Sequence, residues 1–125
     1  MNTVSSIPAM HKVLPADEPV LTIPEAAELM GVVVTRVFHL INDHQIIPVR
    51  RDGVKLLPKA YFNEHGELMK FVPGVIALLS DGGFQDEEIL SYLFTEDESL
   101  PGRPIDALHG HLAREVMRRA QAMAF

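Results

Sequence analysis

The fold is decided by residues 21–57, which read LTIPEAAELMGVVVTRVFHLINDHQIIPVRRDGVKLL. Thr22 and Glu25 stand three residues apart in the pattern of a capping box, in which each side chain accepts a backbone N–H of the other residue. With Pro24 in the first turn, this pattern predicts the start of a short helix. Gly31 is expected to end the helix, because glycine adopts the left-handed conformation without steric cost.

A second helix is predicted from about residue 34 to residue 43. Its apolar residues Val37, Leu40 and Ile41 recur at the spacing i, i+3, i+4 and form one inward face. Val33 stands where such a helix usually carries a serine or threonine cap, so a backbone amide must find another partner. The polar residues on the other faces of this helix are Thr35, Arg36 and His39.

A basic hairpin follows in residues 46–57. The dipeptide Asp52-Gly53 between two apolar-rich runs is the strongest short-range signal for a β-hairpin with a type I′ turn, and Pro58 closes the second strand. A capped helix, a glycine turn, a second helix and a basic hairpin, in this order, are typical of a winged helix-turn-helix with a two-stranded wing.

A winged helix-turn-helix points to double-stranded DNA as the partner, with the second helix in the major groove. The residues predicted to contact base edges are Thr35, Arg36 and His39, and those predicted to contact phosphates are Arg50, Arg51 and Lys55. Arg36 is the one strong cation of the helix and has the chemistry to pair with guanine. The competing interpretation is a helical domain that carries a basic hairpin on its surface.

The charge is unevenly distributed along the chain. The 125 residues carry a formal net charge of −6 and are 47% hydrophobic, which excludes a disordered, highly charged chain. Residues 36–59 hold five bases and two acids, whereas residues 71–100 hold seven acids and no Lys or Arg. This division of sign indicates two halves with different partners, although a solvated surface also explains the acidic run.

Several kinds of site are not expected in this sequence. The chain has no cysteine, so it has no disulfide, no thiolate metal site and no thiol nucleophile. Its histidines lack the spacing of a tetrahedral metal set, and no HExxH motif or nucleophile elbow occurs. We therefore predict no metal, no cofactor and no catalytic residue. No apolar run approaches the ~20 residues of a membrane span and no secretory signal is visible, so the protein is predicted to be cytoplasmic.

The chain as a whole is predicted to be mainly α. Its predicted parts are a flexible tail over residues 1–20, the winged helix-turn-helix over residues 21–70 and a small helical C-terminal domain over residues 71–125. In the C-terminal domain, helices are expected over residues 73–79, from Asp86, and after Pro104 with a possible break at Gly110.

The sequence also carries blocks that resemble known proteins. The opening, residues 21–32, looks like the excisionase/MerR-like winged-helix group. The downstream blocks are Val49-Arg50-Arg51, Pro73-Gly74, Asp81–Phe84, Tyr92–Thr95, Arg103–His109 and Arg114–Phe125. They resemble the small actinobacterial DNA-binding proteins that are substrates of a receptor-type serine/threonine protein kinase.

This resemblance, which covers roughly residues 20–125, carries its own expectations. It implies a winged helix-turn-helix, a helical C-terminal domain particular to the family, and DNA binding that is reduced when a threonine of the tail is phosphorylated. Thr3 is the only threonine before Thr22. The resemblance therefore points to Thr3 as the phosphorylation site and to a serine/threonine protein kinase as a partner.

A second, fainter resemblance concerns residues 102–108, GRPIDAL. This run after an acidic loop is similar to antitoxin-type toxin-binding domains, which implies a protein partner for the C-terminal domain. A packed helix start with Pro104 at its first position explains the same residues. The alternative function is thus a protein-interaction adaptor in which the helix-turn-helix is kept as a scaffold.

Overall fold

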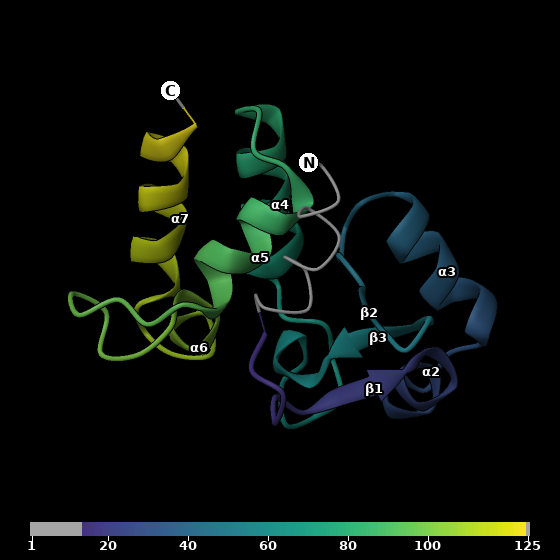
Figure 1. Ribbon diagram of the computed structural model, residues 1–125. Coiled ribbons are helices and arrows are strands. Elements are labelled where there is room, and N and C mark those ends of the chain that lie inside the picture. The colour runs from purple at the N-terminus through teal and green to yellow at the C-terminus, as the bar shows by residue number, and fades with distance from the viewer. Residues whose placement is uncertain (1–13, 125) are drawn as a thin grey trace.

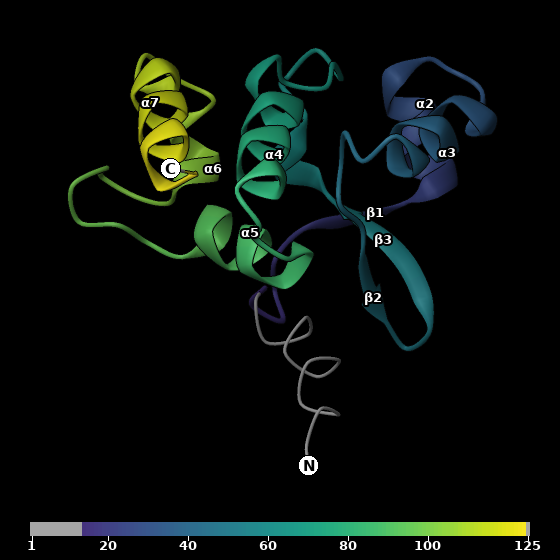
Figure 2. The same ribbon diagram turned by 90° about the horizontal axis from the view of Figure 1, so that it is seen from above.

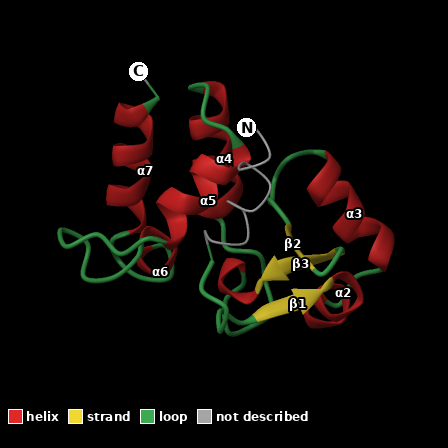
Figure 3. Ribbon diagram, in the orientation of Figure 1, coloured by secondary structure: helices red, strands yellow, loops and turns green. Residues whose placement is uncertain are grey.

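Helices dominate the structure, a computed structural model that describes residues 14–124. The elements in chain order are β1 (Val20–Thr22), α2 (Ile23–Met30), α3 (Val34–Asn42), β2 (Val49–Arg51), β3 (Val54–Pro58), the 3-10 turn η2 (Lys59–Tyr61), α4 (Phe71–Asp81), α5 (Asp86–Phe94), α6 (Pro104–Ala107) and α7 (Ala113–Met123). In Figures 1 and 2, α2, α3 and the sheet lie on one side of the molecule and α4 to α7 on the other. The mainly α winged helix-turn-helix fold is confirmed (Figure 3).

The helix-turn-helix begins as the capping pattern predicts. The Thr22 hydroxyl accepts the Glu25 N–H at 3.2 Å, and the Glu25 carboxylate accepts the Thr22 N–H at 2.8 Å. Gly31 ends α2 with a left-handed φ of 71°. At the start of α3, Val33 makes no side-chain cap hydrogen bond, because a valine side chain has no hydrogen-bond acceptor.

The sheet has three antiparallel strands in the order β1-β3-β2. Arg51 pairs with Val54, so only Asp52 and Gly53 form the turn. Both turn residues have positive φ, 52° and 80°, as a type I′ turn requires. The predicted hairpin is therefore confirmed, and β1 adds a third strand along the free edge of β3.

Residues 14–20 are packed into the molecule, so the prediction of a flexible tail through residue 20 is wrong for this segment. Leu14 is 3% exposed in the core, and Glu18 is 8% exposed. Val20 opens β1 and pairs with Pro58. The segment shows no helix or strand period because its order comes from residues far along the chain. Residues 1–13 lie outside the described residues, and for them the tail remains a prediction.

The helical half differs from its predicted outline mainly in length. α4 is longer at both ends than the predicted residues 73–79 and packs against α7. The stretch after Pro104 is divided into α6 and α7 by residues 108–112, which include the expected break at Gly110. α5 starts at Asp86 as predicted, with three acids in its first turn, where the helix dipole favours them.

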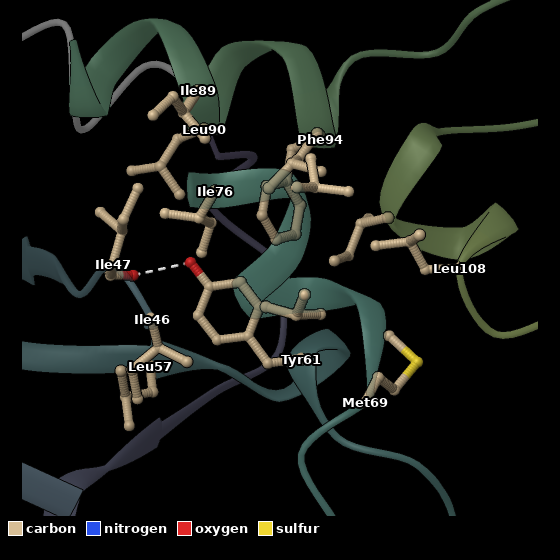
Figure 4. Packing of buried hydrophobic residues seen from close by; sticks show 14 of the residues in the cluster. Ile46, Ile47, Leu57, Tyr61, Met69, Ile76, Ile89, Leu90, Phe94 and Leu108 are labelled. Atoms are coloured by element: carbon tan, nitrogen blue, oxygen red, sulfur yellow. Dashed lines mark hydrogen bonds between the residues drawn. The ribbon is translucent and has the colours of Figure 1, made fainter. Parts of the chain in front are cut away.

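Tyr61 joins the two halves at the centre of the core (Figure 4). Its side chain is fully buried, and its hydroxyl donates a 2.7 Å hydrogen bond to the carbonyl oxygen of Ile47, in the loop between α3 and β2. Its ring centroid lies 6.4 Å from that of Phe94 in α5. Burial raises the pKa of Tyr61 far above its usual value, because the ionised phenolate would lose its hydration.

A second link joins the N-terminal segment to the helical half. The Arg103 guanidinium pairs with Glu18 at 2.5 Å and with Asp106 at 2.8 Å, and it lies 5.3 Å from the Phe94 ring centroid. Hydrogen bonds from Arg103 hold the pKa of Asp106 below its usual value. The Glu18 side chain is only 6% exposed, so its charge depends on Arg103 as the partner within the described residues.

The Tyr61 hydrogen bond predicts that the two tyrosines of the chain contribute differently to the free energy of unfolding. Tyr61→Phe is expected to lower the free energy of unfolding by about 1–3 kcal/mol, because the buried Ile47 carbonyl loses its donor. Tyr92→Phe is the matched control, since the Tyr92 hydroxyl has no hydrogen-bond partner among residues 14–124. Urea denaturation of both variants measures the difference. Equal losses in the two variants would contradict the role of the hydrogen bond.

The raised pKa of Tyr61 also fixes the sign of a pH effect. The folded state keeps the phenol neutral while the unfolded chain ionises it near pH 10, so stability is present below that pH and is lost as the pH rises. Tyr61→Phe is expected to flatten this alkaline loss in urea titrations at increasing pH. A loss as steep as that of the unmodified protein would assign the effect to other groups.

The Glu18–Arg103 pair predicts that removal of the Arg103 charge strongly lowers the stability of the fold. Arg103→Ala is expected to cost about 3 kcal/mol of unfolding free energy, the lower end for a broken buried pair, because Glu18 is left buried and charged. Arg118→Ala is the control: its side chain is 69% exposed and pairs with Glu115, so a much smaller loss of unfolding free energy is expected. Similar losses in both variants would show that Glu18 does not depend on Arg103.

Candidate nucleic-acid interface

α3 turns the predicted base-contacting residues toward solvent. Its buried face is formed by Val37 and Leu40, which are 0% and 3% exposed. Thr35, Arg36 and His39 are all exposed on the rest of the helix surface. The helical period therefore places these three side chains together on the side of α3 that faces away from the core.

The hairpin separates the three bases that were predicted to act together. Arg50 and Lys55 are cross-strand partners, so their side chains lie on the same face of the hairpin. Arg51 lies on the opposite face, because successive residues of a strand alternate. Its guanidinium donates to the carbonyl oxygen of Pro15 at 2.8 Å and to that of Ala16 at 3.5 Å. Arg51 thus holds the N-terminal segment, while Arg50 and Lys55 face outward.

Strand alternation is the signal that could have separated Arg51 from Arg50 in the sequence. Arg51 has the same strand parity as Val49, and Val49 is 2% exposed in the core. The alternation in the sequence is therefore sufficient to predict on which face of the hairpin Arg51 lies. The Pro15 and Ala16 carbonyl groups that it meets there depend on packing and have no local signal.

The two halves of the molecule differ in whether their basic residues form ion pairs. No carboxylate of residues 14–124 forms an ion pair with any base of the segment 36–59, namely Arg36, Arg50, Arg51, Lys55 and Lys59. In the helical half, by contrast, Arg103, Arg118 and Arg119 all pair with carboxylates. The positive charge of the winged half is therefore available to an anionic partner.

Glu115 is the centre of the charge network on α7. It accepts hydrogen bonds from both Arg118 and Arg119, and these bonds lower the pKa of Glu115 to about 2. Arg119 also lies 3.6 Å from Asp97, in the loop between α5 and α6. This loop lies at the end of the molecule opposite α3 (Figures 1 and 2). The acids of this loop are thus kept away from α3, whereas Asp86 of the same acidic run lies 2.7 Å from His44, just after the end of α3.

Three apolar residues at α3 are exposed, which the sequence analysis did not predict. Val33, Val34 and Phe38 are 71%, 39% and 41% exposed. Phe38 follows the buried Val37 directly, so the helical period already places it off the core face. The candidate interface is therefore a surface of mixed apolar, polar and cationic side chains.

Other kinds of site find little support in residues 14–124. Within that range, no three His, Asp or Glu side chains are grouped so that they could hold a metal ion. None of the helices there is both long and apolar enough to cross a membrane. Thr3, the predicted phosphorylation site, lies outside the described residues.

Comparisons with known proteins match both halves. Residues 6–62 match the family described as DNA-binding protein Rv2175c, wHTH domain, and residues 69–124 match the Rv2175c C-terminal domain of unknown function. The DNA-binding protein Rv2175c of Mycobacterium tuberculosis (strain ATCC 25618 / H37Rv) is 44% identical over 134 residues, which cover 98% of this chain and 92% of that protein. The chain belongs to the Rv2175c family.

A solved structure agrees with this membership of the Rv2175c family. The NMR structure of Rv2175c matches with a TM-score of 0.82 at 43% sequence identity, covering 90% of this chain and 86% of that chain. An Rv2175c-type winged helix-turn-helix followed by the family's C-terminal domain is therefore the architecture of this protein. The resemblance drawn from the sequence blocks is confirmed at the level of the family.

Proposed function

We propose that this protein binds double-stranded DNA, with α3 in the major groove and the outward face of the hairpin on the phosphates. The observation that carries the proposal is that the lysines and arginines of the winged half form no ion pair with a carboxylate of residues 14–124, whereas three arginines of the helical half do. Unpaired cations on an exposed surface favour a polyanion, because their binding releases counterions. The printed name of the M. tuberculosis relative, a DNA-binding protein, supports the same function.

The roles of the individual residues follow from where they lie. Arg36 is placed against guanine, with Thr35 and His39 beside it at neighbouring base edges. Arg50 and Lys55 contact phosphates from the outward face of the hairpin. Arg51, although it was predicted with them, already donates to carbonyl groups of the N-terminal segment, so its role is to support the wing.

The charge distribution favours one orientation of the protein on DNA, with α3 and the hairpin toward the duplex and the acidic loop away from it. The net charge of −6 would repel DNA if it were spread evenly. The acidic loop between α5 and α6 lies at the end of the molecule opposite α3, so salt screens its repulsion of DNA that is bound at α3. We place the protein among cytoplasmic regulators that bind DNA and perform no catalysis.

The phosphate contacts predict a change in the salt dependence of binding. Arg50→Ala is expected to weaken binding to all duplexes and to reduce the slope of log K against log salt by about 0.9. Replacing Arg51 as well is expected to leave the slope near that value, because Arg51 lies on the other face of the hairpin and is held by the Pro15 carbonyl group at 2.8 Å. Fluorescence anisotropy with one duplex at several salt concentrations measures the slopes.

Arg114→Ala is the control for this experiment. Arg114 is exposed on α7, so this substitution removes one positive charge from the helical half, as Arg50→Ala does from the hairpin. Its slope is expected to equal that of the unmodified protein. Equal reductions in the Arg50 and Arg114 variants would mean that only the total charge matters and would contradict the proposed surface. Negligible duplex binding at low salt would favour the adaptor function, with the helix-turn-helix as a scaffold.

We further propose that phosphorylation of the tail at Thr3 by a serine/threonine protein kinase weakens DNA binding. The described chain begins at Leu14, next to the Pro15 carbonyl that Arg51 contacts on the hairpin. Thr3 is eleven residues earlier in the sequence, which places it no more than about 40 Å from this point even in a fully extended chain. A phosphate adds about −1.5 to −2 charges, which repel the duplex or compete with its phosphates for Arg50.

This regulation predicts that the modification acts only through residue 3. Duplex affinity at one salt concentration is expected to fall after kinase treatment of the unmodified protein and to stay constant in Thr3→Ala. Circular dichroism is expected to be unchanged, because the proposed effect is a change of charge and not of fold. Unchanged affinity of the phosphorylated protein would contradict the electrostatic effect. A loss that persists in Thr3→Ala would assign it to another residue, such as Ser5 or Ser6.

A further inference from the structure

The outward surface of α3 contains more apolar area than a solvated helix needs. Of six large apolar side chains that are exposed within residues 14–124, three belong to α3 or its cap: Val33, Val34 and Phe38. Val34 and Phe38 are four residues apart, so they are neighbours on one face. Phe38 is 41% exposed although its ring is the largest side chain of this helix. An exposed apolar group at a binding surface indicates an apolar partner group.

The major groove of DNA offers one such group, the C5 methyl of thymine. Side chains from the recognition helix reach base edges there, and apolar contacts with this methyl distinguish thymine from cytosine. Val34 and Phe38 are separated by about 6 Å along the helix axis, which is close to two base-pair steps. The spacing therefore suits two thymine methyls on nearby base pairs.

A second copy of the chain is a less suitable occupant of this surface. A stable protein interface buries about 800 Å² on each partner, which three partly exposed side chains do not supply. In a two-fold dimer the same patch meets itself, so the net positive segments 36–59 of both copies would approach each other. Charge complementarity favours a polyanion.

We propose that Phe38 and Val34 bind thymine methyl groups in the major groove and give the protein a preference for duplexes that carry them. The inference rests on the proposed DNA binding and adds the chemical group that the apolar part of the surface recognises. Arg50 and Lys55 hold the duplex through its phosphates, whereas Phe38 and Val34 distinguish bases by a methyl group. The two contributions are separable, because removal of a methyl group leaves the phosphate charge unchanged.

The test uses duplexes that differ only in this methyl. An alternating A·T duplex is compared with its counterpart in which every thymine is uracil, and an alternating G·C duplex with its 5-methylcytosine counterpart. The unmodified protein is expected to bind the methylated member of each pair about 4-fold more tightly for one contacted methyl and about 15-fold for two. The salt slope is expected to be equal within each pair.

Variants then assign the preference to α3. Phe38→Ala is expected to remove most of the thymine–uracil difference while keeping the salt slope. Met123→Ala, which removes a side chain of similar exposure from α7, is expected to keep the full difference. Sedimentation of the free proteins accompanies both titrations. A dimer that dissociates in Phe38→Ala would show that a second copy covers this face and would overturn the proposal.

The comparison within the unmodified protein requires no variant to fold. Equal affinity for the thymine and uracil duplexes, with binding itself intact, would overturn the methyl recognition and leave DNA binding standing. A difference that persists after both Phe38→Ala and Val34→Ala would also overturn it, since the methyl would be sensed elsewhere. If no duplex is bound even at low salt, the proposed function fails first and this inference fails with it.

Discussion

A single buried hydroxyl fixes the wing, the second helix of the helix-turn-helix and the helical half in one geometry. Tyr61 donates to the carbonyl oxygen of Ile47, in the loop that leads from α3 into β2. Because the site excludes water, neither polar group has an alternative partner there, and the loop is held in one conformation. The same ring packs beside Phe94 of α5. The distance between α3 and the hairpin, on which any groove-spanning contact depends, is thus set inside the core.

The parts of the fold that could be predicted are those whose interactions are local. The Thr22–Glu25 capping box and the Asp52-Gly53 turn are complete within four residues, so the sequence alone identifies both. β1 and the segment before it obtain their order from β3 and Arg103, far along the chain. Only three residues of β1 pair, too few to produce an alternation in the sequence. Their packing is a property of the tertiary structure.

The candidate site divides in the same way. Periodicity identifies the outward position of Thr35, Arg36 and His39 on α3, because Val37 and Leu40 mark the core face. Which cations have no carboxylate partner is decided by long-range packing, and the sequence shows only the uneven charge. Within residues 14–124, the helical half places carboxylates next to Arg103, Arg118 and Arg119, whereas the lysines and arginines of the segment 36–59 form no such pair. A chain with a net charge of −6 can therefore present a cationic surface.

The ion pair between Glu18 and Arg103 has a consequence for the order in which the protein is made. The two residues are 85 positions apart, and Glu18 leaves the ribosome first. At translation rates of about 5–20 residues per second, its carboxylate waits roughly 4–17 s for its guanidinium partner. During this time the segment before β1 stays in water, since burial of the lone charge is unfavourable. The segment around Glu18 is therefore expected to pack only after Arg103 has emerged, although it is synthesised much earlier.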